Sequence, residues 1–527
     1  DSLDDVLNLT VAQANALGTV TLTAGDVVTV ADTATAIDGL TEANILALDA
    51  AGVDKIDAGG GAFALTLAEY NALGNVALTQ ADDVTLADSS ANLAALDATA
   101  IGGLSTAGID TIDVSDNALT LSVAQALALG TVTFAADDVV TVLDTAAAIQ
   151  GLDAGQIGAF DTAGIDVLDS TEGAFNLTVA QVRALGNIVA AGSDTVTLLD
   201  TGVNIASLSS VEIAALAGAG IDRIDASNVV LSLSVAQLHA LGTVTLTSSD
   251  SISLSDTSAN IAALSVAQIS ALSGLKVDLI NATDDVLELS LAQFNAIGTV
   301  GINSGDNMTI LDTGANLAGL TPAQIGALEG KGVDTFKASD GNLDLTVAQF
   351  NVLGGVDLVA ENIVTLKDTG AALAGLSAAA IAGLEGAHVD ALDATDDVLD
   401  LDVAQATALG AVTIAAGDLV TIKDTGAAIS GMTPPQIGAL SGAGIDAIDA
   451  SDDAFSMAVA QATALNGVVI DATDTATLLD TGAAIAGMSE AQISALGTSG
   501  FTSIDANNDA LSLSLAQIAA LGTVTLT

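Results

Sequence analysis

The chain repeats itself every 56 residues, and this period constrains its fold more than any other feature of the sequence. The phrase VAQANALGTVTLT at 11–23 returns as LAQIAALGTVTLT at 515–527. One glycine marks the same point of nearly every copy, at Gly18, Gly74, Gly130, Gly186, Gly242, Gly298, Gly354, Gly410 and Gly522, with Asn466 in the remaining position. An unbroken period of this length is typical of a solenoid. We therefore predict one uninterrupted array over residues 1–527, nine full periods plus a partial one, with no separate domains.

Within one period the local signals alternate between helix and strand. A Thr followed by a short apolar-faced segment and a Gly predicts a capped helix that ends in a left-handed residue, and Asn is the next best residue for that conformation. Short β-branched runs around polar turns predict strands. The expected elements of the first period are a helix over 10–18, strands over 19–23 and 27–31, one or two helical turns over 32–40, a longer helix over 41–52, and strands over 53–58 and 63–67.

Each period thus consists of two similar coils, each with a helix, a strand, a turn and a strand. Such a coil cannot bury its apolar face alone, but it can do so when it stacks on its neighbours. We expect each strand to pair in parallel with its counterpart in the next coil. Because strands stack about 4.8 Å apart and helices need about 8–10 Å, helices in every coil favour a curved or superhelical stack. The predicted fold class is an α/β solenoid.

The apolar content agrees with thin layers. Hydrophobic residues make up 51% of the chain, yet aromatic residues make up only 2%. The core must therefore be built from many small aliphatic side chains, which suits a stack of coils better than a globular core.

The charge of the chain limits its partners. With 65 acidic against 8 basic residues, the formal net charge is −57. This excludes attraction to nucleic acid and to anionic membrane surfaces, and it makes divalent cations the expected counter-charge. No cysteine is available for disulfides or thiolate sites. No stretch is apolar enough to predict membrane insertion, so we expect a soluble protein.

One aspartate recurs in every copy at the end of the second strand. These residues, which we call the strand-end column, each precede Thr or Ser, a pattern that favours a helix N-cap. The alternative is that they bind calcium. The members are Asp32, Asp88, Asp144, Asp200, Asp256, Asp312, Asp368, Asp424 and Asp480.

Carboxylates also cluster in the later strand–turn–strand of each period, as in DALDATDD at 390–397 and DAIDASDD at 446–453. Several hard oxygen ligands at one tight turn are what Ca²⁺ prefers. The alternative is that Asp, Asn and Ser simply form good turns and keep the array soluble, since Asn281, Lys337 and Thr502 replace aspartates in single copies. The candidate metal ligands are Asp390, Asp393, Asp396, Asp397, Asp446, Asp449, Asp452, Asp453, Asp110, Asp113 and Asp116.

The sequence offers little support for catalysis. His239 and His388 occupy different positions of the period and have no repeated counterpart. Neither has a recognisable nucleophile or orienting partner, so we predict that the chain is not an enzyme. A glutamine column from Gln13 to Gln517, with Glu69 as its only acidic member, recurs on the first helix of each period. We expect it to bond to a neighbouring coil or loop backbone.

Short phrases of the chain resemble the repeat arrays of a known group of proteins. The succession of DTSANIAAL at 256–264, IDxIDA and LxLSVAQ is similar to repeats of very large acidic surface proteins of proteobacteria, often grouped with RTX-type adhesins exported by type I secretion. The resemblance implies export, a cell-surface or matrix location and calcium-assisted folding. The chain departs from the group in lacking the glycine-rich RTX nonapeptide, since DAGGGAFAL at 57–65 does not have its aspartate spacing.

Three functions remain open from the sequence. The first is a secreted structural or adhesive scaffold, stabilised by divalent cations. The second is a self-assembling subunit of a filament or surface layer, whose partners are copies of itself. The third is binding to ice or another flat lattice through rows of Thr such as those in TVTLT at 19–23.

The two ends of the sequence fall at different points of the period. Joining residue 527 to residue 1 would skip 33 of the 56 residues, and neither end carries a polar capping repeat. We therefore expect the array to continue in the same phase in a longer polypeptide.

Overall fold

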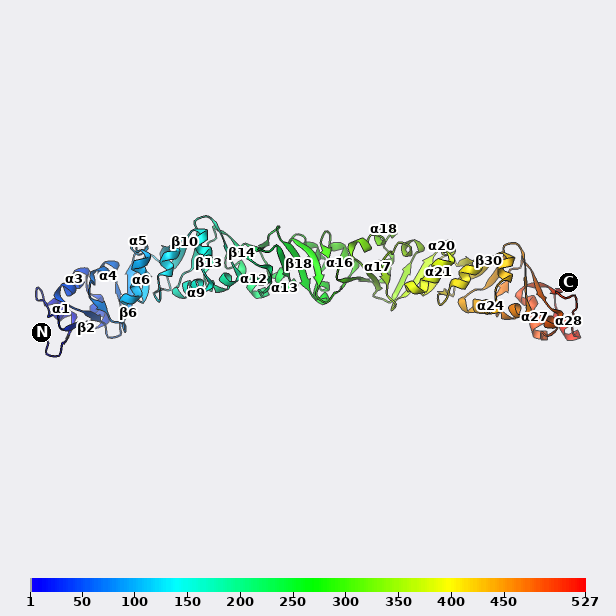
Figure 1. Cartoon of the computed structure of the whole chain (residues 1–527), viewed down its shortest axis with the longest axis horizontal. Helices are drawn as coiled ribbons and strands as arrows, with labels where there is room; N and C mark the ends of the chain where they lie inside the picture. The colour runs from blue at the N-terminus through cyan, green and yellow to red at the C-terminus, as the bar shows by residue number, and fades with distance from the viewer. Residues whose placement is uncertain (1) are drawn as a thin grey trace. The chain divides into compact units, whose positions relative to one another are not determined.

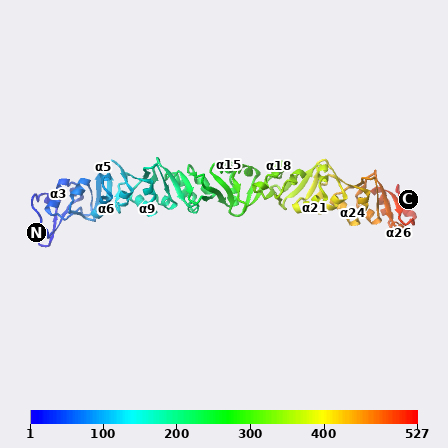
Figure 2. The same cartoon turned by 45° about the horizontal axis from the view of Figure 1, so that its top comes forward.

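A computed structural model describes residues 2–527 and shows a solenoid of repeated helix and strand units. The chain divides into two compact units. One unit extends to Ser255 and includes Gly274–Leu279, and the other holds Asp256–Ser273 and Ile280–Thr527. Within each unit, the colour follows residue number from one end to the other in both views (Figures 1 and 2). The coils of each unit are therefore stacked in sequence order.

Each period contains three helices. The first helices are α1 (Val11–Asn15), α4 (Leu67–Ala72), α7 (Val123–Leu127), α10 (Val179–Ala184), α13 (Val235–Ala240), α16 (Leu291–Ala296), α19 (Val347–Phe350), α22 (Val403–Ala408), α25 (Val459–Ala464) and α28 (Leu515–Ala520). The short helices are α2 (Ala34–Asp38), α5 (Ser90–Ala94), α8 (Ala146–Gln150), α11 (Gly202–Ala206), α14 (Ser258–Ala262), α17 (Gly314–Ala318), α20 (Gly370–Ala374), α23 (Gly426–Ser430) and α26 (Gly482–Ala486).

The third helix varies most in length. It is α3 (Glu42–Ala51), α6 (Ala98–Ala107), α9 (Ala154–Ala163), α12 (Ser210–Leu216), α15 (Val266–Ala271), α18 (Pro322–Ile325), α21 (Ala378–Leu384), α24 (Pro434–Leu440) and α27 (Glu490–Ser499). Short 3₁₀ turns follow three of them, namely η1 (Glu329–Lys331), η2 (Glu385–Ala387) and η3 (Ser441–Ala443).

Four kinds of strand alternate with these helices. Two-residue strands follow the first helix, at β5 (Ala77–Leu78), β9 (Thr133–Phe134), β13 (Val189–Ala190), β17 (Thr245–Leu246), β21 (Gly301–Ile302), β25 (Asp357–Leu358), β29 (Thr413–Ile414), β33 (Val469–Ile470) and β36 (Thr525–Leu526). The central strands are β2 (Val27–Ala31), β6 (Asp83–Asp88), β10 (Val139–Asp144), β14 (Thr195–Asp200), β18 (Ser251–Asp256), β22 (Asn307–Asp312), β26 (Ile363–Asp368), β30 (Leu419–Asp424) and β34 (Thr475–Asp480).

The other two kinds flank the acidic turn. Before it lie β3 (Lys55–Asp57), β7 (Thr111–Val114), β11 (Val167–Ser170), β15 (Arg223–Ala226), β19 (Val277–Ala282), β23 (Thr335–Ala338), β27 (Ala391–Ala394), β31 (Ala447–Ala450) and β35 (Phe501–Ala506). The remaining strands are β1 (Val6–Leu9), β4 (Ala62–Leu65), β8 (Ala118–Leu121), β12 (Ala174–Leu177), β16 (Val230–Leu233), β20 (Val286–Leu289), β24 (Asn342–Leu345), β28 (Val398–Leu401) and β32 (Ala454–Met457).

The helix boundaries confirm the expected capping. Thr10 and Thr41 accept hydrogen bonds from the backbone three residues on, and each forms a capping box. The longer helix α3 ends at Gly52 with φ 86°. Gly18 takes φ 58° three residues after α1 ends, and Asn466 takes φ 43° at the same point of its period. The asparagine therefore meets the left-handed backbone requirement that glycine meets elsewhere.

The strands form parallel four-stranded sheets, which recur with the period. In the first sheet the order is β1-β2-β3-β5, with Val6 opposite Val27 and Lys55 opposite Ala77. These two pairings join counterpart strands of successive coils, as expected. The central pairing of β2 with β3 was not expected, because it joins the second strand of one coil to the first strand of the next.

The core is a thin layer of aliphatic side chains between the sheets and helices. Val28 and Val30 of β2 are fully buried, as is Ile45 of α3, while Ile37 and Ile56 are almost fully buried. Residues of β2 alternate between buried and partly exposed sides. The small side chains thus fill a narrow interior, in agreement with the low aromatic content.

Candidate functional site

The strand-end column does not form the helix N-caps that the sequence predicted. Thr201, which follows Asp200, is the N-cap of α11 and accepts from the Asn204 N–H. Asp200 lies one residue earlier and uses both carboxylate oxygens. Oδ1 accepts from the Thr201 N–H at 2.7 Å, and Oδ2 accepts from the Val179 N–H of α10 at 3.0 Å. The column therefore ties the end of a strand to the start of the preceding first helix.

Hydrogen bonding changes the acidity of this column. Burial raises the pKa of Asp200, but the hydrogen bonds from the Asn204 amide and from the Thr201 and Val179 N–H groups outweigh it and leave the pKa lowered. Asp88 and Asp312 have lowered pKa values for the same reasons. A carboxylate that accepts several donors is stabilised in its charged form.

We expect Asp200→Ala to lower the free energy of unfolding by about 0.5–2 kcal/mol, as for other lost helix-terminus caps, whatever the calcium concentration. Because the pKa of Asp200 is lowered in the folded state, its contribution is present above its unfolded pKa and is lost as the pH falls through its folded pKa. Urea unfolding at neutral pH and in strong acid, with calcium or with chelator, measures the difference. A deficit that disappears on removing calcium would show that Asp200 is a metal ligand instead.

The acidic turns contain aspartates with four different roles. Where the first residue of a turn is an aspartate, it accepts from a strand N–H of the preceding coil. Asp390 Oδ2 accepts from the Val364 N–H at 2.8 Å, and the Asp390 N–H donates to the Val364 carbonyl. Asp446 and Asp110 make the same bonds to Val420 and Val84. These carboxylates extend the pairing of the central strand by one side-chain hydrogen bond.

The third acidic residue of these turns accepts a hydrogen bond from the first N–H of the short helix. Asp396 Oδ1 accepts from the Gly370 N–H of α20 at 2.7 Å, and Asp452 and Asp116 bond in the same way to Gly426 and Ser90. The next residue has a backbone role, because Asp397 and Asp453 take φ values of 59° and 58°. The sharp turn therefore needs residues that tolerate the left-handed conformation.

The second acidic residue of each turn lies on an outer strand face. Asp393 pairs with Lys367 at 2.6 Å and Asp449 with Lys423 at 2.7 Å, each directly across the sheet. Asp113 occupies the same place opposite Ala87. Where Lys337 replaces this aspartate, it pairs with Glu288 at 3.2 Å. These ion pairs are half-exposed, so each adds little stability.

The carboxylates of the candidate metal ligands thus contact different partners and do not converge on one point. Among residues 2–527, no group of three or more His, Asp or Glu side chains is arranged to hold a metal ion. In the turns at 390–397 and 446–453, two of the four carboxylates already accept backbone N–H groups and a third faces a lysine. The residues of these turns, as arranged here, do not fit a resident calcium ion.

The glutamine column has the structural role that the sequence predicted. Gln349 Oε1 accepts from the Thr346 N–H at 2.8 Å within its own helix. Its Nε2 donates to the carbonyls of Ala318 and Leu320, one coil earlier, at 2.8 and 2.6 Å. The same pair of bonds is made by Gln125, Gln181, Gln237, Gln293, Gln405, Gln461 and Gln517.

A further column of carboxylates lies in polar turns that the sequence analysis did not single out. These residues, which we call the buried column, precede the central strands and are at most 9% exposed. Their recurrence at one point of nearly every period is the signal that could have identified them. They are Asp26, Asp82, Asp138, Asp194, Asp250, Asp306, Asp418 and Asp474, with Asn362 in the remaining copy.

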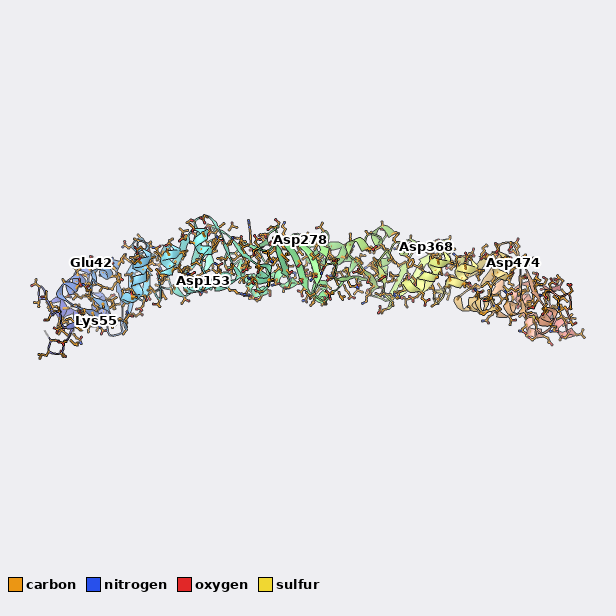
Figure 3. The ribbon with its side chains drawn as sticks, in the orientation of Figure 1. Glu42, Lys55, Asp153, Asp278, Asp368 and Asp474 are labelled. Carbon is orange, nitrogen blue, oxygen red and sulfur yellow. The ribbon has the colours of Figure 1, made fainter. Side chains whose placement is uncertain are left out.

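Each member of the buried column accepts from the backbone N–H of the residue 24 positions earlier. For Asp306 the donor is the Ala282 N–H, at 2.8 Å. Burial raises the pKa of Asp306, the Ala282 bond opposes this, and the nearby Asp285 and Asp284 charges raise it further. The pKa values of Asp138, Asp418 and Asp474 are also raised, with burial as the main cause. Figure 3 labels Asp278, Asp368 and Asp474, which represent the first acidic turn residues, the strand-end column and the buried column.

The remaining candidates lie apart from these columns. His239 is exposed in the last turn of α13, and His388 is exposed at φ 59° after η2. Across residues 2–527, the structure contains no helix that combines the length and the apolar character needed to cross a membrane.

Comparisons with known proteins give no family for this chain. No family model matches it, and no curated protein matches its sequence. Solved structures with some similarity include a plant peptide hormone receptor, RGFR1, in complex with RGF2, at 11% identity, a TM-score of 0.17, and coverage of 95% of this chain and 79% of that one. A TDR receptor matches at 12% identity and a TM-score of 0.16, over 92% of this chain and 89% of that one. The Arabidopsis receptor kinase HAESA ectodomain, with a bound peptide hormone, matches at 10% identity and a TM-score of 0.14. This match covers 91% of this chain and 69% of that one. TM-scores this low carry no functional argument.

Proposed function

We propose that the chain is a non-enzymatic scaffold of the cell surface or extracellular matrix, with a structural or adhesive role. The carrying observation is that the recurring polar side chains are engaged in holding the coils together. Gln349, Asp200, Asp390 and Asp396 each bond to the backbone of a neighbouring coil or helix. Side chains that repeat in this way build a stack, whereas a catalytic site needs a unique constellation.

The resemblance of the repeat phrases to RTX-type surface proteins supports the extracellular part of this proposal. The strongly acidic composition, with a net charge of −57, also suits a scaffold that stays soluble at high local concentration. The mechanism is geometric, because repeated coils present equivalent surfaces at a fixed spacing and can bind many weak partners together.

Negative-stain images of dilute protein, with and without calcium, test the proposal. Separate single particles support the scaffold. Ordered filaments or sheets would support the alternative, in which the chain is a subunit of a self-assembling layer and acidic surfaces are bridged by divalent ions. Turnover of a substrate by the intact chain, lost on replacing His239 or His388, would contradict the non-enzymatic proposal.

We also propose that divalent cations stabilise the array as diffuse counterions. The turns bring like charges together: burial raises the pKa of Asp418, and the charges of the nearby Asp393, Asp397 and Asp396 raise it further. Cations that accumulate around the array offset this repulsion without occupying a fixed site.

We expect calcium and magnesium to raise the thermal midpoint equally when compared with chelator at fixed ionic strength, because screening depends on charge and not on coordination geometry. Calorimetry in the three conditions checks this. A larger shift with calcium would show specific sites, and an unchanged midpoint in all three would contradict any stabilisation by divalent ions.

A further inference from the structure

The buried column contains carboxylate oxygens that have no hydrogen-bond donor. In Asp194, Asp250 and Asp306 the Oδ1 atom is buried and unpartnered among the described residues. Their Oδ2 atoms accept from the N–H groups of Ser170, Ala226 and Ala282, at 2.7, 2.9 and 2.8 Å. These side chains are only 5–7% exposed. A buried oxygen of an ionised carboxylate that lacks a donor is costly, so each of these positions needs an explanation.

Asn362 provides the explanation, because this asparagine occupies the same position of the period in another copy. Its Oδ1 accepts from the Ala338 N–H at 2.8 Å, as the aspartate Oδ2 atoms do. Its Nδ2 donates to the carbonyl of the same residue, Ala338, also at 2.8 Å. The second side-chain atom at this position therefore faces a backbone acceptor. A neutral carboxylic acid has the same shape as the amide and can make the same pair of bonds, whereas a carboxylate cannot donate.

Asp82 shows how the position looks when a donor is available. Its Oδ2 accepts from the Ala58 N–H and its Oδ1 from the Gly60 N–H, both at 2.8 Å. Gly60 belongs to a turn with three consecutive glycines. The corresponding residues in the copies of Asp194, Asp250 and Asp306 are Glu172, Asn228 and Asp284, which lie at the same point of the period.

The groups that face these three aspartates are themselves acidic. Asp169 of β11 interacts with Asp194, and Asp225 of β15 shares the Thr247 hydroxyl with Asp250. Asp284 and Asp285, in the turn after β19, face Asp306. Like charges this close disfavour a second ionised carboxyl group.

We propose that Asp306 is protonated in the folded protein, and that it donates its proton to the backbone carbonyl of Ala282, the residue whose N–H it accepts. The array then binds a proton as it folds, and its coils hold together more tightly as the surroundings become mildly acidic. The direction follows from linkage. A group whose folded pKa is raised contributes stability that is complete below its unfolded pKa, about 3.9 for Asp, and is lost as the pH rises through the folded pKa.

The test is the variant Asp306→Asn, in chelator. Asparagine supplies a permanent donor, and Asn362 shows that the fold accepts it. We expect the thermal midpoint at about pH 7.5 to rise by about 1–2 °C relative to the original protein, with little change at about pH 4.5, so the pH dependence becomes flatter. The control removes one exposed strand charge, by Asp344→Asn, and it measures the general relief of repulsion.

Infrared spectroscopy on the same proteins gives a second measurement that does not depend on stability. At about pH 6 the original protein should show the C=O stretch of protonated carboxyl groups, well above the ordinary Asp pKa of about 3.9. The Asp306→Asn variant should lose intensity in this band, and the control should not. Absence of the band in the original protein would overturn the proposal, as would an equal gain in stability for the control.

Discussion

Replacing Gln349 by alanine is expected to destabilise the array by about 3–5 kcal/mol, one of the largest effects of any single substitution here. The side chain is 5% exposed and joins two coils. Its loss leaves the carbonyls of Ala318 and Leu320 without their donor and the Thr346 N–H without its acceptor. Urea unfolding measures the loss, and native-state hydrogen exchange shows whether protection falls in both coils.

Three further substitutions separate the contributions of this glutamine. Gln349→Glu keeps the acceptor but cannot donate, so it isolates the two bonds between coils. Gln13→Ala removes the bond to Thr10 within its own helix and should cost only about 1 kcal/mol. Glu69→Gln should stabilise the protein, because Glu69 caps Thr66 but has no N–H to offer. A loss for Gln349→Ala no greater than for Gln13→Ala would contradict a role in joining coils.

Replacing Gly370 by alanine is expected to cost about 2–4 kcal/mol. A Cβ atom at this position would lie 1.8 Å from the carbonyl oxygen of Val398, in a strand of the next coil. A backbone atom cannot turn aside as a side chain can, so α20 and β28 would have to separate. The Gly370 N–H also donates to Asp396 at 2.7 Å, and that bond would be strained by the same movement. Thermal unfolding measures the cost.

Position 146 provides the matched comparison, because alanine naturally occupies the first position of its short helix there. Ala146→Gly should cost no more than about 1 kcal/mol, the usual helix penalty of glycine. The two exchanges are chemical opposites at equivalent points of the period. If both cost the same, close backbone approach at Gly370 does not matter to stability.

Much of the fold was determined locally and could be predicted from single phrases. Thr10 and Thr41 begin helices because their side chains accept from the backbone three residues on. Asn466 ends a helical segment in place of glycine because both residues tolerate positive φ. Such features depend on neighbours a few residues apart, which the sequence displays directly. The period then predicted the parallel stacking, since repeated segments of similar sequence make equivalent contacts.

The sequence also showed which residues recur but not what they face. Asp390, Asp393 and Asp396 are close along the chain and were predicted to converge, yet the turn directs them to a strand N–H, a lysine and a helix N–H. These partners are 26 residues earlier and become neighbours only when one coil stacks on the next.

The sequence by itself determined the repeat, the helices and strands, the aliphatic core and the acidic character of this protein. The tertiary structure alone decided that the strand-end column reaches back to the preceding helix and that the buried column lies in the interior. The physical reason is that burial and hydrogen bonding between coils depend on the offset of the stack. Pairing β2 with β3 sets an offset of 26 residues that no local phrase encodes, and this offset decides which carboxylates are exposed and which are buried.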